Sequence, residues 1–127
     1  MSGKEKKLVN NISYCSTTDE NGIISSVTKE LAEISGYTQD ELIGQNHNIL
    51  RSQDMPKIIY KIMWETLNKK KIFIGFTKNK TKDGSYYWME DKVYLFSGGK
   101  SEKCNYISHK SPISSRAKEV LSTRFFN

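Results

Sequence analysis

The sequence predicts an α+β domain: a five-stranded antiparallel sheet with helices inserted between its second and third strands. Five segments rich in β-branched and aromatic residues are separated by turn signals, at 12–17, 23–27, 72–80, 86–96 and 103–109. A longer amphipathic segment, 54–70, and a polar stretch before it follow the second of these. Strands joined by short turns, with the helices grouped together in the chain, are typical of an α+β architecture. A chain of 127 residues fits one such domain.

The turn residues support the strand assignments. Asp19–Gly22 ends in Asn-Gly, a strong hairpin signal between the first two strands. Lys82–Ser85 contains Asp-Gly and joins the third strand to the fourth, and Ser97–Lys100 contains two glycines before the fifth. Each turn therefore joins two segments that we expect to pair.

Two short helices are expected before the long one. Thr28 is a suitable cap for a helix over 29–34, which Gly36 follows. Thr38 and Glu41 have capping-box spacing for the second helix, which Gly44 ends.

The long helix is predicted over 54–70, with Asp54 as its cap and Pro56 in its first turn. Its apolar residues recur at helical spacing: Met55, Ile58, Ile59, Ile62 and Met63. Trp64 lies off the centre of that stripe, because each residue of a helix turns by about 100°. It either caps the edge of the core or walls a pocket, and the spacing alone favours neither.

Composition excludes several classes of function. The net charge is +6, but the basic residues are interspersed with acidic ones, which favours a solvated surface over a nucleic-acid site. Cys15 and Cys104 are far apart and have no metal-ligand spacing, so reduced thiols in a cytosolic protein are expected. No apolar run suggests a signal peptide or membrane insertion. His47 and His109 have no nucleophile or metal partner at a recognisable spacing, so we expect no enzyme activity.

The chain divides into three parts in this interpretation. Residues 1–11 are a polar, flexible leader, 12–110 the domain, and 111–127 a C-terminal signalling or docking helix. One face of that helix carries Ala117, Val120, Leu121 and Phe125. The stripe predicts self-association as a homodimer or docking to a partner, unless the helix folds back on its own sheet.

The most informative stretch is SGYTQDELIGQNHNILRSQDMP, residues 35–56. It is too polar and too irregular for one long element, and its hydrogen-bonding side chains gather at Asn46-His47-Asn48, between short helices. Irregular polar connections of this kind often build ligand sites on a rigid scaffold.

This stretch, with MWETL around Trp64 and KNKTKDGSYYW from Lys78 to Trp88, resembles the FAD-binding PAS domain of bacterial aerotaxis receptors. The resemblance covers about 12–110 and implies a PAS fold, with FAD as cofactor. It implies that His47, Arg51, Asp54 and Trp64 help to hold FAD, with Asn48 beside them. Asn79 resembles the flavin-facing asparagine of flavin-binding PAS and light-sensing LOV domains.

The residues themselves leave alternatives for these roles. Arg51 can pair with pyrophosphate or form a surface salt bridge with Asp54. Asn79 is either a pocket residue or an exposed residue near a strand end, and His47 either contacts the cofactor or is a satisfied histidine at a junction. Asn105 could add an amide, but a one-residue change of register would turn it outward.

Thr28 departs from the family, which usually has a pocket-facing Asn at the start of that helix. The departure puts FAD affinity in doubt, and predicts that Thr28→Asn tightens FAD binding. It also favours the alternative function, a cofactor-free PAS module for dimerisation or protein interaction. Haem is disfavoured because the long helix contains no axial histidine.

The resemblance implies a cytoplasmic redox or energy sensor that signals to a chemoreceptor-type protein or a covalently linked signalling domain. His47 stands where LOV photoreceptors have the cysteine that forms a flavin adduct, so we expect a response to electrons and not to light. Histidine ordinarily titrates near neutral pH, so a change in flavin charge is expected to move its proton.

Overall fold

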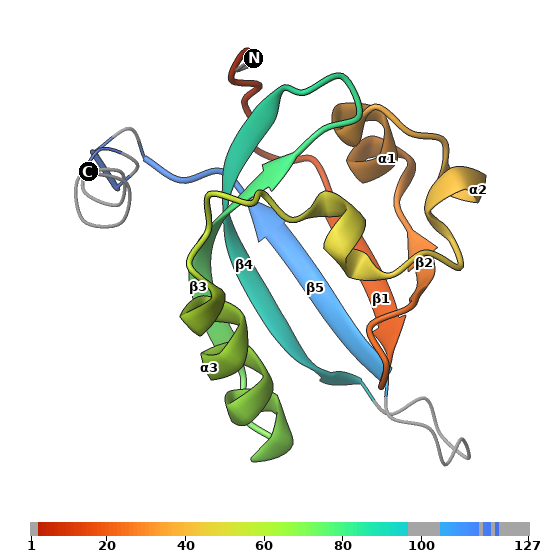
Figure 1. Ribbon diagram of the computed structural model, residues 1–127, viewed down its shortest axis with the longest axis vertical. Helices are drawn as coiled ribbons and strands as arrows, with labels where there is room; N and C mark the ends of the chain where they lie inside the picture. The colour runs from red at the N-terminus through yellow and green to blue at the C-terminus, as the bar shows by residue number, and fades with distance from the viewer. Residues whose placement is uncertain (1–2, 97–104, 115, 118, 120–127) are drawn as a thin grey trace.

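A computed structural model describes residues 3–96, 105–114, 116, 117 and 119. Its sheet has the strand order β2-β1-β5-β4-β3, and each neighbouring pair is antiparallel (Figure 1). The strands are β1 (Tyr14–Asp19), β2 (Ile24–Val27), β3 (Phe73–Lys80), β4 (Tyr86–Phe96) and β5 (Asn105–Ser111). The helices between β2 and β3 are α1 (Lys29–Ser35), α2 (Gln39–Leu42), the 3-10 helix η1 (His47–Leu50) and α3 (Lys57–Asn68). The predicted fold class is confirmed.

The helices divide over the sheet and build two parts of the core. In Figure 1, α1 and α2 lie toward β1 and β2, α3 lies beside β3, and β5 runs between them. One buried cluster forms with α1, α2 and η1 and includes Leu31, Leu42 and Leu50. The other forms below α3 and includes Met63 and Leu67. Neither set of helices covers the whole inner face.

The short helices begin where the sequence predicts. The hydroxyl of Thr28 accepts a hydrogen bond from the Leu31 N–H, and Gly36 ends α1 with a φ of 84°, a left-handed conformation that glycine adopts without a steric penalty. Thr38 and Glu41 form the complete capping box of α2. These local signals need no long-range information, which is why the sequence reveals them.

The long helix starts later and faces the sheet differently from the prediction. Its N-cap is Pro56, without a side-chain cap, so the assignment of Asp54 as cap is wrong. The Asp54 carboxylate instead accepts a hydrogen bond from Lys78 Nζ on β3, at 2.7 Å. Ile58 and Ile62 are 50% and 45% exposed. The buried side of α3 is centred on Met63 and Leu67, because the helix packs with Trp64 and Tyr60 turned inward.

Residues 3–8, which the sequence assigns to a leader, pack against the domain. The Lys6 N–H donates to the Tyr86 carbonyl and the Tyr86 N–H donates to the Lys4 carbonyl, so the segment extends along the start of β4. Leu8 is buried in the core with Tyr14.

The C-terminal helix prediction falls mostly outside the described residues. Residues 116, 117 and 119 are helical, and the Ala117 N–H bonds to Ser114 Oγ. Val120, Leu121 and Phe125 lie outside the described residues, as do the turn at 97–100 and Cys104.

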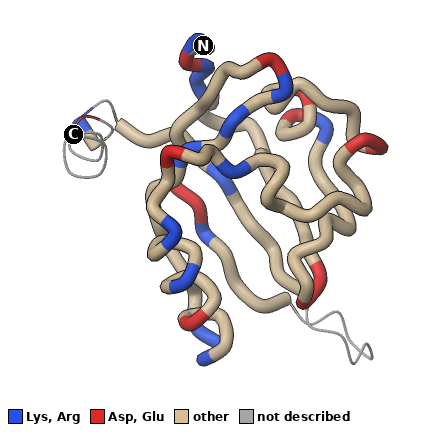
Figure 2. The backbone as a smooth tube through the Cα atoms, in the orientation of Figure 1, with Lys and Arg blue, Asp and Glu red and all other residues tan. Residues whose placement is uncertain are grey.

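Figure 2 shows Lys and Arg distributed along the backbone with Asp and Glu between them. None of the described helices has the length and apolar character needed to cross a membrane.

Candidate ligand pocket

A cavity of about 160 Å³ lies between α3, the η1 segment and the inner face of the sheet. Its walls come from every layer of the domain: Ser16, Thr18, Asn21, Gly22, Asn46, His47, Asn48, Arg51, Met63, Trp64, Leu67, Asp91, Val93, Tyr106, Ile107 and Ser108. Of the predicted site residues, the structure brings together His47, Asn48, Arg51 and Trp64.

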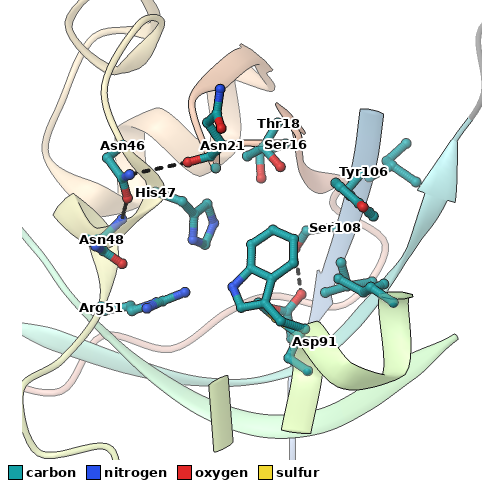
Figure 3. A pocket seen from close by; sticks show the side chains of 16 residues that line it. Ser16, Thr18, Asn21, Asn46, His47, Asn48, Arg51, Asp91, Tyr106 and Ser108 are labelled. Atoms are coloured by element: carbon teal, nitrogen blue, oxygen red, sulfur yellow. Dashed lines mark hydrogen bonds between the residues drawn. The ribbon is translucent and has the colours of Figure 1, made fainter. Parts of the chain in front are cut away.

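Asn46 fixes the backbone that presents His47. Its side-chain oxygen accepts from the Asn48 N–H at 2.9 Å, and its amide nitrogen donates to the Asn21 carbonyl at 3.5 Å. Figure 3 shows both bonds, with the His47 ring directed away from them into the pocket. The sequence indicated Asn46 only as a polar neighbour, and its capping role needs the turn geometry.

His47 Nε2 is buried and has no hydrogen-bond partner among the described residues. Burial, and to a lesser extent the positive charge of Lys110, lower the pKa of His47 to about 3. His47 is therefore a neutral imidazole at neutral pH. The expectation of a proton poised near neutral pH is wrong, because that expectation used the pKa of a solvated ring.

Arg51 lies at the end of η1 and stacks on Tyr60 of α3, with the guanidinium carbon 3.7 Å from the ring centre. Its Nε and the Tyr60 hydroxyl are both buried, without a hydrogen-bond partner in the described part of the chain. Burial lowers the pKa of Arg51, and raises the pKa of Tyr60 to about 12. The alternative role of Arg51, a surface salt bridge with Asp54, is not observed, because Asp54 pairs with Lys78 instead.

An aromatic pair forms one wall of the cavity. The rings of Trp64 on α3 and Tyr106 on β5 meet edge to face, with centroids 5.3 Å apart and planes at 88°. Trp64 also packs against the core cluster below α3. The two interpretations of Trp64 therefore hold together, since the ring covers the core edge and lines the pocket.

The sheet contributes a polar floor that the sequence did not reveal. Ser16 on β1 pairs in register with Ser108 on β5, and Asp91 on β4 pairs with Lys110 on β5. Ser16, Ser108 and Asp91 all line the pocket, and Ser16 Oγ is buried without a partner. Period-two alternation along β4 and β5 could have placed Asp91 and Ser108 inside, but only with the strand register already known.

Thr28 is not among the pocket-lining residues. Its hydroxyl donates to the Ser13 carbonyl and accepts from the N–H groups of Cys15 and Leu31. The side chain thus joins α1 to the start of β1, and the structure gives no support to a pocket-facing role.

Asp54, Asn79 and Asn105 are also absent from the lining. Asn79 is buried, which excludes the exposed alternative, but its amide donates to the Tyr87 hydroxyl at 3.0 Å. Its backbone bridges to that of Arg51, so Asn79 supports the pocket wall from behind. Asn105 alternates with the inward-facing Tyr106 and lies on the other face of β5.

The chemistry of the lining suits a flat ligand with several polar atoms and a negatively charged part. A buried polar group without a partner costs about 1–3 kcal/mol, which a matching ligand would recover. His47 Nε2, Arg51 Nε and Ser16 Oγ are three such groups, and Figure 3 shows His47 and Arg51 on one side of the cavity. Within the described part of the chain, no group of three or more His, Cys, Asp or Glu residues could hold a metal ion.

Comparisons with known proteins agree with this architecture. The chain is 40% identical over 82 residues to an aerotaxis receptor of Escherichia coli, a match that covers 65% of this chain and 16% of the receptor. It is 27% identical over 99 residues to a nitrogen fixation regulatory protein of Klebsiella pneumoniae, with 78% of this chain and 20% of that protein covered. The chain thus spans about a fifth or less of the length of these relatives.

Solved structures show the same fold at low identity. A light-oxygen-voltage domain studied with a flavin analogue superposes with a TM-score of 0.75 at 16% identity, over 88% of this chain and 85% of that one. The PAS domain of a protein from Colwellia psychrerythraea gives 0.71 at 21% identity, over 82% and 88%. The family model described as PAS fold matches residues 24–108, so this chain belongs to the PAS family.

Proposed function

We propose that this PAS domain binds FAD in the pocket between η1, α3 and the sheet, and acts as a redox or energy sensor. The observation that carries the proposal is the set of buried polar atoms without partners that line one cavity, at His47, Arg51 and Ser16. The similarity to an aerotaxis receptor and to light-oxygen-voltage domains supports a flavin as the ligand.

The chain's own residues suggest how the group would be held. Neutral His47 can donate or accept one hydrogen bond without a charge change near neutral pH. Arg51 keeps its charge and offers a fork of donors to a phosphate-bearing tail. Trp64 and Tyr106 offer aromatic surface, and Asn48 an amide at the rim. The bound flavin would supply reversible electron transfer, which the amino-acid side chains lack.

The signal would leave the pocket through the sheet. Asp91 and Ser108 touch the cavity from β4 and β5, whose alternate residues lie on the opposite face. A change in ligand charge would therefore act on strands that a partner can contact from outside. By analogy with the aerotaxis receptor, we infer a chemoreceptor-type partner or a covalently linked signalling domain, in the cytoplasm.

The test is reconstitution followed by separation. Purified protein is incubated with FAD, freed of unbound FAD by gel filtration, and its visible spectrum is recorded with the flavin-to-protein ratio. The proposal expects near-stoichiometric flavin that remains with the protein peak. A folded protein that emerges colourless after reconstitution would instead support a cofactor-free module for dimerisation or protein interaction.

A further inference from the structure

A buried ion pair lies in the floor of the pocket. Asp91 on β4 and Lys110 on β5 pair in register, and Lys110 Nζ is 3.3 Å from an Asp91 carboxylate oxygen. The side chains are 7% and 0% exposed. Ser108 links them, because its hydroxyl donates to Asp91 and accepts from Lys110 Nζ at 2.6 Å. Figure 3 shows the Ser108–Asp91 bond at the cavity, away from Arg51 and His47.

Stability alone does not account for this pair. Removing two charges from water costs several kcal/mol each, and well-packed apolar residues in place of a buried pair are often neutral or stabilising. The two charges of the pair are also not equally close to the cavity. Asp91 and its partner Ser108 line the cavity, whereas Lys110 does not. A ligand in the pocket would thus meet the negative end of the pair first.

The field of the pair extends across the cavity. Beyond the dominant effect of burial, Lys110 lowers the pKa of His47 and Asp91 raises it, although His47 belongs to the opposite wall. Arg51 and Asp91 are the charged groups among the described residues of the lining. Charges in such a site are poorly screened by water, so each of the three, Arg51, Asp91 and Lys110, affects the energy of a charged ligand.

We propose that the Asp91–Lys110 pair sets the reduction potential of the bound flavin, with Asp91 lowering and Lys110 raising it. The inference rests on the proposed FAD site. When flavin takes up two electrons from a reductant and one proton from solvent, its charge becomes more negative by one. Asp91 opposes that change, Lys110 favours it, and Ser108 holds the two charges at fixed distance. Both are positioning residues that act through the field, without a bond to the reacting atoms.

The test is a double-mutant cycle in which the midpoint potential of the bound flavin is measured for each variant. Holoprotein is titrated anaerobically with dithionite beside a reference dye, for wild type, Asp91→Asn, Lys110→Met and the double variant. Asp91→Asn is expected to raise the potential and Lys110→Met to lower it. Each shift should favour one oxidation state by tenfold or more, which is about 30 mV for a two-electron couple. The double variant restores the net charge near the ligand, so its potential should return toward wild type.

Matched controls come from the same strand. Glu90→Gln and Lys92→Met remove the same charges from positions whose side chains alternate with Asp91 on β4. They are expected to leave the potential unchanged. Circular dichroism and the flavin-to-protein ratio check each variant for folding and loading. If Lys110→Met does not fold, Asp91→Asn and the double variant still give the sign of the Lys110 contribution.

The possible results distinguish a failure of the proposed FAD site from a failure of the proposed role of the ion pair. Wild-type protein without bound flavin would overturn the proposed function before any variant is made. Loaded variants whose potentials match wild type, or single variants that shift in the same direction, would overturn the role of the ion pair alone. Shifts of equal size in Glu90→Gln and Lys92→Met would also contradict it.

Discussion

At the scale of single residues, Arg51 and Trp64 are the side chains on which ligand retention should depend most. Arg51 offers an unpartnered Nε and Trp64 an aromatic wall, from opposite elements of the pocket. Arg51→Ala and Trp64→Ala are each expected to weaken FAD binding about tenfold, the effect of losing roughly 1–2 kcal/mol of contact. Fluorescence titration with FAD measures the dissociation constant.

Ile58→Ala is the control for this pair of variants, since Ile58 is an exposed residue of α3 outside the lining. It should bind FAD as wild type does. If Arg51→Ala and Trp64→Ala both keep full affinity with the fold intact, the assignment of these residues to the site is wrong.

His47 makes stability depend on pH in a defined direction. Its pKa is about 3 in the folded protein and has its ordinary value of 6.5 when unfolded, so between these values the unfolded chain binds the extra proton. The free energy of unfolding should therefore fall as the pH falls below about 6.5, by up to about 1.4 kcal/mol per pH unit. Urea unfolding from neutral pH down to about pH 5 measures this slope.

His47→Gln is expected to flatten that slope by about one proton. Asp83, whose pKa is lowered by Thr81, loses its stabilising contribution only at more acidic pH, so it does not contribute within this window. An unchanged slope in His47→Gln would mean that the ring is solvated in solution.

Residue types at the pocket could be predicted only in part. His47, Asn48, Arg51 and Trp64 were found because the polar stretch and its family resemblance lie in continuous sequence. Asp91, Ser108 and Ser16 were missed because their common face depends on pairing between β1, β5 and β4. The resemblance places residues 28 and 79 at the pocket, yet in this structure the side chains of Thr28 and Asn79 are bonded to neighbouring elements.

At the scale of elements, local capping is the most predictable feature and can be tested directly. Thr38 and Glu41 hold the start of α2, and Glu41 also accepts from Lys82 Nζ at 2.8 Å in the turn before β4. Thr38→Ala is expected to lower the free energy of unfolding by about 1 kcal/mol, the usual cost of losing a cap. Denaturant unfolding measures it, with Thr38→Ser as the variant that keeps the hydroxyl. Equal stability of Thr38→Ala and wild type would contradict the capping box.

Thr28 tests the placement of α1. Because its hydroxyl bonds to Ser13, Cys15 and Leu31, the structure predicts that Thr28→Asn leaves FAD affinity unchanged. Asn is itself a good N-cap, so α1 should survive the substitution. Titration with FAD decides between this expectation and the one from sequence, since tighter binding would show that residue 28 reaches the cofactor.

The long helix shows the limit of pattern reasoning. Its periodicity correctly predicts a helix, but the face turned to the sheet is set by which neighbours it meets. Ile58 and Ile62 belong to the apolar stripe and are nevertheless exposed, while Tyr60 and Trp64 pack against the buried cluster below α3. The rotation of a helix about its axis is a tertiary property, and the sequence of the helix does not contain it.

At the scale of the whole molecule, the order of the strands in the sheet is the feature that the turn signals could not predict. Turns predict the pairs β1–β2, β3–β4 and β4–β5, whereas the pairing of β1 with β5 joins distant parts of the chain. It places β5 in the centre of the sheet, where Ser108, Tyr106 and Lys110 contact or support the pocket. No turn joins β1 to β5, so the sequence analysis did not predict this pairing.

The measurement that tests the central claim most directly is a reduction and reoxidation cycle of gel-filtered, FAD-reconstituted protein, compared with blue-light illumination of the same sample. Anaerobic dithionite should bleach the visible flavin bands and oxygen should restore them, with the flavin still on the protein. Light should form no adduct that decays in the dark, because the family resemblance puts His47 where LOV photoreceptors have their cysteine, and Cys15 is on β1, outside the pocket lining. A light-driven, dark-reversible adduct, or flavin that leaves the protein on reduction, would contradict a redox sensor at this site.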